Sequence, residues 1–205
     1  MMHRPRGTSP TNRWQRVLTF DEPVLPEILR DTSATVPGIL TVVVVMFVSG
    51  LGGFIWWLIE DHPSKGEFFF ESAILGSLIS TGLFFVWAGL VAAMGGQLGG
   101  AKRPGQFNIS KNEALAGTVR TMSFAVSPFA VSGLMFIPGL EFEISLLAFG
   151  LLLLSTTLAV RTALGVPLGR ALGTNLVGFF IWLLVLSSLM DRGDYFAPGA
   201  FIWGS

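Results

Sequence analysis

Long runs of apolar residues alternate with short polar stretches along most of the chain. Five of these runs are long enough to cross the roughly 30 Å hydrocarbon core of a bilayer as helices. We place them at Pro37–Ile59, Phe68–Met94, Thr121–Leu140, Ile144–Val160 and Ala171–Met190. Inside a bilayer, only a helix satisfies all the backbone polar groups of such a run by itself. The pattern therefore predicts an all-α polytopic membrane protein with five transmembrane helices.

The N-terminal residues follow a different pattern. Residues 1–19 are polar and basic without a helical period, so we expect a flexible or docked cytoplasmic arm there. Phe20–Asp31 places apolar residues at helical spacing opposite charged ones, which is typical of an amphipathic helix lying on a membrane surface. We interpret residues 20–36 as this interfacial helix and a linker; an ordered loop capping the cytoplasmic face is the alternative. A five-helix transmembrane domain (37–190) and a short outer tail (191–205) complete the division.

The basic residues predict the orientation of the five helices. If the helices alternate in direction and the N-terminus lies inside, 11 of the 13 Lys and Arg residues are inside, and only Lys65 and Arg192 are outside. Loops on the cytoplasmic side of a membrane carry such an excess of Lys and Arg. The N-terminus is therefore predicted to be cytoplasmic and the C-terminus to lie on the opposite side.

Composition supports a membrane protein and excludes several kinds of chemistry. The chain is 51% hydrophobic and only 13% charged, whereas a soluble domain has about 25% charged residues. Its formal net charge is zero, which argues against a nucleic-acid partner. It has no cysteine, so disulfides, thiolate metal sites and cysteine nucleophiles are excluded.

The predicted spans carry no Asp, Glu, Lys or His near their middle, where such groups mark proton and ion pathways. His3 and His62, the only histidines, fall outside the spans, which excludes axial ligation of haem or chlorophyll within the bilayer. No catalytic triad, HExxH motif or phosphate-binding loop is present. We therefore expect no enzyme activity and no cofactor. The one candidate metal site is the outer cluster around Glu60, Asp61 and His62, although acidic residues also gather on that side wherever cations are excluded.

Small residues and a proline are the candidates for close helix packing. Glycine in a membrane helix lets a neighbouring backbone approach closely. The candidates are Gly50, Gly52, Gly53, Gly95, Gly96, Gly99, Gly100 and Pro128. Pro128 is expected to kink the third span, with Ser123 and Ser127 bonding the carbonyls it frees; the kink either lines a cavity or serves packing alone. Asn175, with Thr174, is expected to hydrogen-bond across helices.

Three cations follow the second span. Lys102, Arg103 and Lys111 lie in the loop Gly95–Glu113 and are candidates for contact with anionic lipid headgroups. Their role in setting orientation explains them equally well.

Four segments resemble the Yip family of Ypt/Rab-interacting membrane proteins, in its bacterial form. They are FDEPVLPEILRDTSATVPGIL from Phe20, GGQLGG from Gly95, SFAVSPFAVSGLMFIPGL from Ser123 and AVRTALGVPLGRALGTNL from Ala159. The resemblance runs from about Phe20 to Met190. It implies a five-helix fold, a bacterial inner-membrane location and a role in interaction rather than catalysis. Rab binding belongs to the eukaryotic branch, whose acidic N-terminal segment is absent here.

We therefore predict a non-catalytic membrane scaffold or adaptor whose partners are membrane lipids and other integral membrane proteins. One alternative is an accessory subunit of a larger transport or electron-transfer complex, respiratory or photosynthetic. A second is a small permease or a lipid-handling protein that uses the region of the Pro128 kink.

Overall fold

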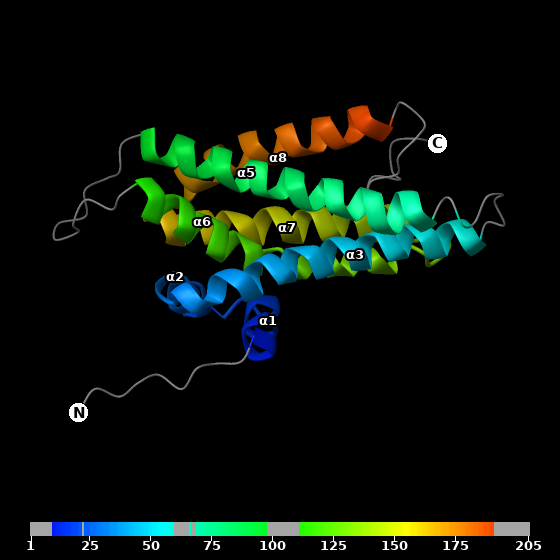
Figure 1. Cartoon of the computed structure of the whole chain (residues 1–205), viewed down its shortest axis with the longest axis horizontal. Coiled ribbons are helices and arrows are strands. Elements are labelled where there is room, and N and C mark those ends of the chain that lie inside the picture. The colour runs from blue at the N-terminus through cyan, green and yellow to red at the C-terminus, as the bar shows by residue number, and fades with distance from the viewer. Residues whose placement is uncertain (1–9, 22, 60–65, 67–68, 98–110, 191–205) are drawn as a thin grey trace.

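The computed structural model describes residues 10–21, 23–59, 66, 69–97 and 111–190. Five stretches of this part are helical, long and apolar enough to cross a membrane, and they pack side by side along their length (Figure 1). They are Thr32–Ile59, Phe69–Gly95, Asn112–Leu134, Glu141–Leu164 and Leu168–Leu186. The predicted fold class, an all-α polytopic membrane protein, is confirmed.

Two of the spans combine an α-helix with a helix of another type. The second consists of a π-helix, η2 (Phe69–Gly76), followed by α5 (Ser77–Gln97). The third consists of α6 (Lys111–Ala125) followed by a 3₁₀-helix, η3 (Ser127–Leu134). The first, fourth and fifth are formed by α3 (Thr35–Ile59), α7 (Glu141–Leu164) and α8 (Leu168–Met190).

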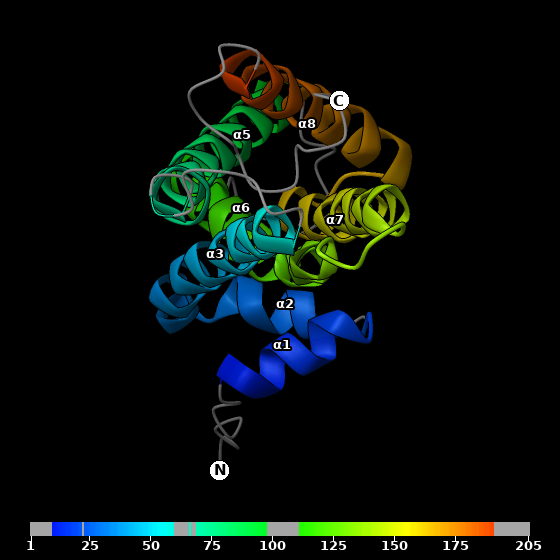
Figure 2. The ribbon, with the colours of Figure 1, turned by 90° about the vertical axis from the view of Figure 1, so that its right-hand side faces the viewer.

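The spans form three layers when the bundle is viewed along its length (Figure 2). α5 and α8 lie together on one side, α6 and α7 lie in the middle, and α3 and η3 lie on the other side. Aromatic side chains fill the core between α5, α7, α8 and η3. The cluster comprises Phe84, Trp87, Phe129, Phe149, Phe179 and Trp182, with ring centroids 5.5–6.3 Å apart.

The first described residues of the chain include two short helices, which lie beneath α3 and η3 (Figure 2). Residues Pro10–Leu18 are a helix, α1, where we expected an arm without a helical period. α1 is fixed to the bundle because Val17 is buried and Trp14 Nε1 donates a 2.7 Å hydrogen bond to Thr41 Oγ1 of α3. These contacts fit the docked form of the expected arm, but residues 10–18 are helical, although we found no helical period there.

The predicted amphipathic helix is present but shorter than Phe20–Asp31. It is α2 (Val24–Arg30), preceded by Pro23 at its N-cap. Pro26 lies in its first turn, where the missing N–H has no partner to lose. A single 3₁₀ turn, η1 (Thr32–Ala34), joins α2 to α3. The apolar residues of α2 are buried within the protein, against α6 and α7 among other elements.

The third span begins about ten residues earlier than Thr121 and ends at Leu134 rather than Leu140. The polar residues 111–120, which we had assigned partly to a loop, continue the helix. At Pro128 the α-helix gives way to η3, because proline has no N–H to donate to the carbonyl four residues earlier. That carbonyl, Phe124 O, instead accepts a 2.6 Å hydrogen bond from Ser127 Oγ. The prediction for Ser127 is confirmed; the one for Ser123 is wrong, because its hydroxyl has no partner within the described chain.

The fourth span is also longer than predicted. Glu141 and Glu143 belong to the first turn of α7, where the helix dipole favours acidic residues. The helix ends at Gly165, whose positive φ of 64° suits a glycine C-cap. α8 likewise starts at Leu168, three residues before the predicted Ala171.

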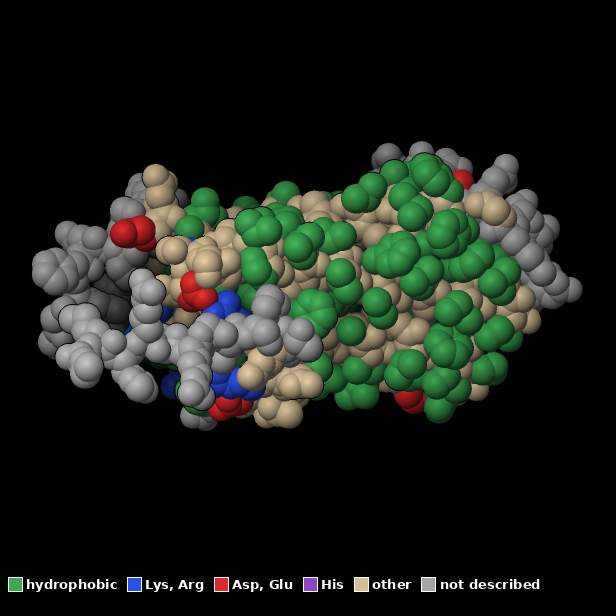
Figure 3. Space-filling view, turned by 60° about the horizontal axis from the view of Figure 1, so that its bottom comes forward, with side chains coloured by type: hydrophobic (Ala, Val, Ile, Leu, Met, Phe, Trp, Pro, Cys, Tyr) green, Lys and Arg blue, Asp and Glu red, His purple; other side chains and the backbone are tan. Residues whose placement is uncertain are grey.

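The basic residues of the described chain are confined to one end of the bundle. Every described Lys and Arg lies on α1, α2, α6, the end of α7 or the start of α8, which meet at one end (Figures 1 and 3). The described charged residues towards the other end are Glu71, Glu141 and Glu143. Between these ends, the face seen in Figure 3 is covered by apolar side chains.

Candidate functional site

Arg120 is the tenth residue of α6 and lies within the third span, not in the loop before it. It is only 7% exposed. Its Nε donates to Thr35 Oγ1 at 3.1 Å, and its Nη1 donates to the carbonyl of Leu29 at 2.7 Å. That carbonyl is in the last turn of α2, where helix carbonyls lack partners within the helix. Arg120 thus joins α2, α3 and α6.

A glycine one turn before Arg120 brings α2 close to α6. A Cβ at Gly117 would lie 2.7 Å from Leu29 Cδ1, so only glycine accommodates that leucine without a shift. We did not predict this contact from the sequence, because we ended the loop at Glu113 and started the span at Thr121. The sequence feature that could have predicted it is the three-residue spacing of Gly117 and Arg120, which places both on one face of a helix.

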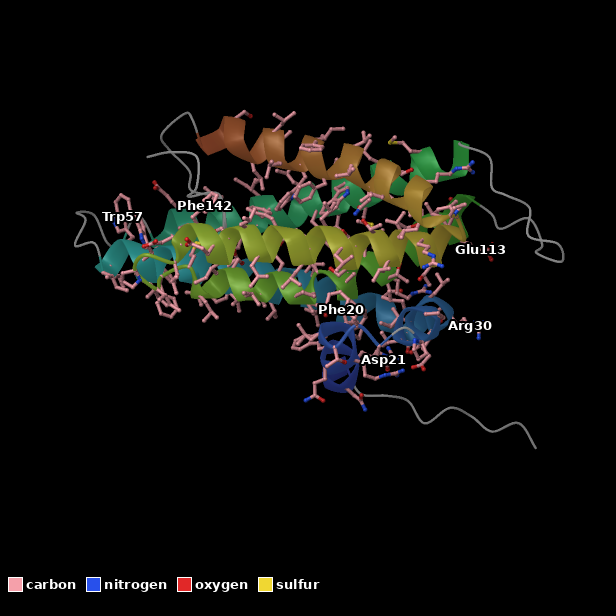
Figure 4. The ribbon with its side chains drawn as sticks, turned by 180° about the vertical axis from the view of Figure 1, so that it is seen from behind. Phe20, Asp21, Arg30, Trp57, Glu113 and Phe142 are labelled. Carbon is pink, nitrogen blue, oxygen red and sulfur yellow. The ribbon has the colours of Figure 1, made fainter. Side chains whose placement is uncertain are left out.

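Ion pairs hold α1 and α2 together at the same end of the molecule (Figure 4). Arg16 Nε contacts Asp21 Oδ2 at 2.5 Å, and its two terminal nitrogens contact Glu27 at 2.6 and 3.0 Å. Arg13 pairs with Asp31. Between the helices, Phe20 has a φ of 53°, a left-handed conformation that is strained for a bulky residue. The chain therefore reverses sharply at a point that the surrounding ion pairs hold in place.

In two of the acidic residues, Glu27 and Asp31, the pKa is lowered, which favours the charged form. The hydrogen bonds from Arg16 lower the pKa of Glu27 below its usual range. The Ser33 hydroxyl, followed by Arg13, lowers the pKa of Asp31 in the same direction. Both acids are ionised at neutral pH, so the pairs between α1 and α2 are formed there.

The glycine-rich part of α3 is the second candidate site. The carbonyl of Gly50 accepts a 3.2 Å hydrogen bond from Ser72 Oγ in η2. On the η3 side, Ser132 Oγ donates to Ser49 Oγ at 2.7 Å. A Cβ at Gly52 would lie 2.6 Å from the carbonyl oxygen of Gly133. The π-helix and the 3₁₀-helix, two types often found at functional positions, therefore both pack on one segment of α3.

Some of the other residues that we predicted for close helix packing lie in the described part of the chain, and some do not. Gly53 is buried in α3, and Pro128 is buried in η3. A Cβ at Gly95 would lie 2.2 Å from Leu164 Cδ1 of α7. Gly96 belongs to α5. Gly99 and Gly100 lie outside the described residues.

The candidates for lipid and metal contact lie mostly beyond the described residues. Of the three lipid candidates, only Lys111 is described, and it is the first residue of α6 rather than part of a loop. Lys102 and Arg103 fall outside the described part. The metal candidates Glu60, Asp61 and His62 also fall outside it. Within the described residues, no group of three or more His, Asp or Glu is placed to hold a metal ion.

Asn175 connects α8 to α7, as predicted. Its Nδ2 donates to Thr156 Oγ1 at 2.9 Å and to Thr157 Oγ1 at 3.0 Å. Thr174 does not share in this contact and instead donates to the carbonyl of Arg170 in its own helix. Three other polar atoms in the region, Asn175 Oδ1, Trp87 Nε1 and Trp182 Nε1, are buried without a partner in the described chain.

The fold and these contacts define an all-α polytopic membrane protein. Polar side chains join its spans at several points, usually by donating to a carbonyl or hydroxyl of a neighbouring helix. Comparison with known protein families, curated proteins and solved structures finds no significant match for this chain. The resemblance to the Yip family therefore stays a prediction.

Proposed function

We propose that this protein is a non-catalytic membrane scaffold or adaptor that associates with other integral membrane proteins and with lipids. Its working surfaces are the outward faces of the spans, and its interior serves to hold those faces in position.

The outward face of α8 carries this proposal. α8 has the smallest buried share of the five spans, 33%. Gly169 and Gly173 lie four residues apart on this helix and are exposed, and a Cβ added to either would have no atom within 4 Å. Glycines at this spacing allow two membrane helices to approach closely. By contrast, Gly178 on the same helix packs directly against Trp87.

The apolar residues that follow continue the same face. Val177, Ile181 and Leu184 are 43%, 41% and 67% exposed. Their spacing after Gly173 places them along one side of the helix. The face therefore combines small residues at one end with larger side chains at the other, which suits a partner helix that crosses α8 near Gly173.

The charge distribution supports placing the basic end in the cytoplasm. The described cations all lie at that end, as expected for a cytoplasmic surface. An accessory subunit of a larger transport or electron-transfer complex would use the same faces. It differs from a scaffold only in the identity of its partner.

The experiment is to purify the full chain in a mild detergent and identify bound proteins by mass spectrometry. We expect a stoichiometric partner that is lost from Gly173→Leu, because a leucine there keeps the partner backbone away. Gly82→Leu is the matched control, since Gly82 is also exposed with open space around it but lies on α5. A partner retained by Gly173→Leu, or lost equally from both variants, would refute association through α8.

A further inference from the structure

A shallow apolar groove runs along the outward face of α7. It has a volume of about 450 Å³ and is lined by Glu143, Leu146, Leu147, Gly150, Leu151 and Leu154. Gly150 provides the depth of the groove, because no atom lies within 4 Å of a Cβ placed there. Leu146, Leu147 and Leu154 are each more than half exposed. The groove therefore faces the hydrocarbon region of the membrane.

A cation lies on the same face beyond one end of the groove. Arg161 follows Leu154 by seven residues, and Leu147, Gly150, Leu154 and Arg161 share one side of the helix. Arg161 is exposed, and no carboxylate of the described chain pairs with it. Its positive charge at this end of the groove is thus not neutralised by the described residues.

The length of this face matches one leaflet of a bilayer. Eleven residues separate Arg161 from Gly150, which corresponds to about 16 Å along a helix. Half of a hydrocarbon core is about 15 Å thick. An acyl chain that starts at the level of Arg161 therefore reaches Gly150 near the bilayer centre.

Arg161 lies at the depth of a headgroup. Asn175 of α8 contacts Thr156 and Thr157 of α7, and the two helices run in opposite directions. Arg161 lies five residues after Thr156 in α7, and Arg170 lies five residues before Asn175 in α8, so this antiparallel pairing brings the two arginines level at the basic end of the bundle. The other end of the groove has Glu143, which repels a phosphate. Only the leaflet at the Arg161 end therefore suits a negatively charged headgroup.

We propose that the α7 groove binds an anionic phospholipid, with its phosphate on Arg161 and one acyl chain along Leu154, Gly150 and Leu147. The inference rests on the membrane placement in the proposed function but not on association through α8. A guanidinium donates several hydrogen bonds to a phosphate, and each cation near a membrane surface favours anionic lipid. Net positive charge at this end disfavours a headgroup that carries its own cation.

The test is native mass spectrometry of the full chain in detergent with added phosphatidylglycerol or phosphatidylcholine. We expect one tightly held phosphatidylglycerol and about fivefold less retention of phosphatidylcholine. Arg161→Gln is expected to lower phosphatidylglycerol retention about fivefold. Gly150→Leu is expected to lower it as well, by filling the groove, while circular dichroism stays unchanged because the position is exposed. Arg161→Lys retains part of the binding, because it keeps the charge but loses the planar group.

Matched controls separate a site from general lipid contact. Arg30→Gln removes an exposed cation at the same end, and Gly82→Leu fills an exposed position on another span; neither should alter retention. Inorganic phosphate in excess should not displace the lipid, because it lacks the acyl chain. Equal retention of the two lipids, equal behaviour of Arg161→Gln and Arg30→Gln, or displacement by free phosphate would each overturn the proposal. None of these results bears on the partner lost from Gly173→Leu, so the two proposals fail separately.

Discussion

A buried arginine in a membrane span must be compensated where it lies. Arg120 uses two of its donors on Leu29 O and Thr35 Oγ1, so its charge serves to tie three helices together. Intramembrane charges often mark a transport pathway. Arg120 is the ninth residue of the 23-residue third span, and both of its hydrogen bonds go to other elements of the protein, so its contacts indicate a structural role.

Replacing Arg120 should destabilise the protein. Arg120→Gln shortens the side chain and leaves the carbonyl of Leu29 without its donor. Hydrogen bonds to charged groups contribute about 1.5–3 kcal/mol, and we expect a loss of that size in the free energy of unfolding. Titration with a denaturing detergent, followed by circular dichroism, measures it.

Arg30→Gln is the control for this change. Arg30 is exposed at the end of α2, so its replacement should alter stability by less than about 0.5 kcal/mol. Equal losses from the two variants would show that the contacts of Arg120 add nothing beyond its charge.

Single polar residues were predictable from the sequence when they lay well inside an apolar run. Asn175 has apolar neighbours on both sides, and its cross-helix hydrogen bonds were expected. Arg120 follows a polar stretch, so from composition alone we predicted that it lies outside the span. Its burial depends on α2 covering that turn of α6, a contact between segments 91 residues apart that no local pattern reveals.

The two irregular helices are positioned by α3. η2 and η3 pack on the segment that contains Ser49, Gly50 and Gly52, and serine hydroxyls bond across both contacts. Non-helical or irregular backbone is tolerated at membrane depth where protein surrounds it. The absence of side chains at Gly50 and Gly52 is what allows these elements to approach α3.

A methyl group at this contact should be costly. In Gly52→Ala the new Cβ would lie 2.6–2.8 Å from three backbone atoms of Gly133, which cannot rotate away. Overpacking of this kind costs about 1–3 kcal/mol, and thermal unfolding in detergent should show a loss in that range.

Gly82→Ala provides the comparison on another span. Open space surrounds Gly82, so alanine should leave stability unchanged or raise it slightly, because alanine favours a helix. A tolerated Gly52→Ala would mean that α3 and η3 separate without cost.

The number and type of the spans were predictable, whereas several of their ends were not. Apolar length alone identified all five. The start of α6 was misplaced because a helix continues beyond the hydrocarbon region, where polar residues such as Lys111 are no longer distinguished from a loop. α1 was missed because it has few apolar residues, and its contact with the bundle depends on a hydrogen bond from Trp14 to Thr41 of α3. The change to a 3₁₀-helix at Pro128 was expected only as a kink.

For the molecule as a whole, the separation of charge links the fold to its placement in the membrane. The described cations gather at one end although they come from helices far apart in the sequence. This arrangement requires the spans to alternate in direction, as they do in Figure 1. With the N-terminus in the cytoplasm, the basic end faces inwards and the acidic turn of α7 faces outwards.

The absence of native cysteine makes this orientation directly testable. Single cysteines at Pro63, Gly105 and Ser205, all outside the described residues, report their side through a thiol reagent that does not cross membranes. Pro63 and Ser205 should react in intact cells. Gly105 should react only after the membrane is opened, because it lies between the end of α5 and the start of α6, at the basic end of the bundle. Reaction at Gly105 alone would reverse the orientation and move the proposed lipid site to the other leaflet. Different sides for Pro63 and Ser205 would contradict the alternation of the spans itself.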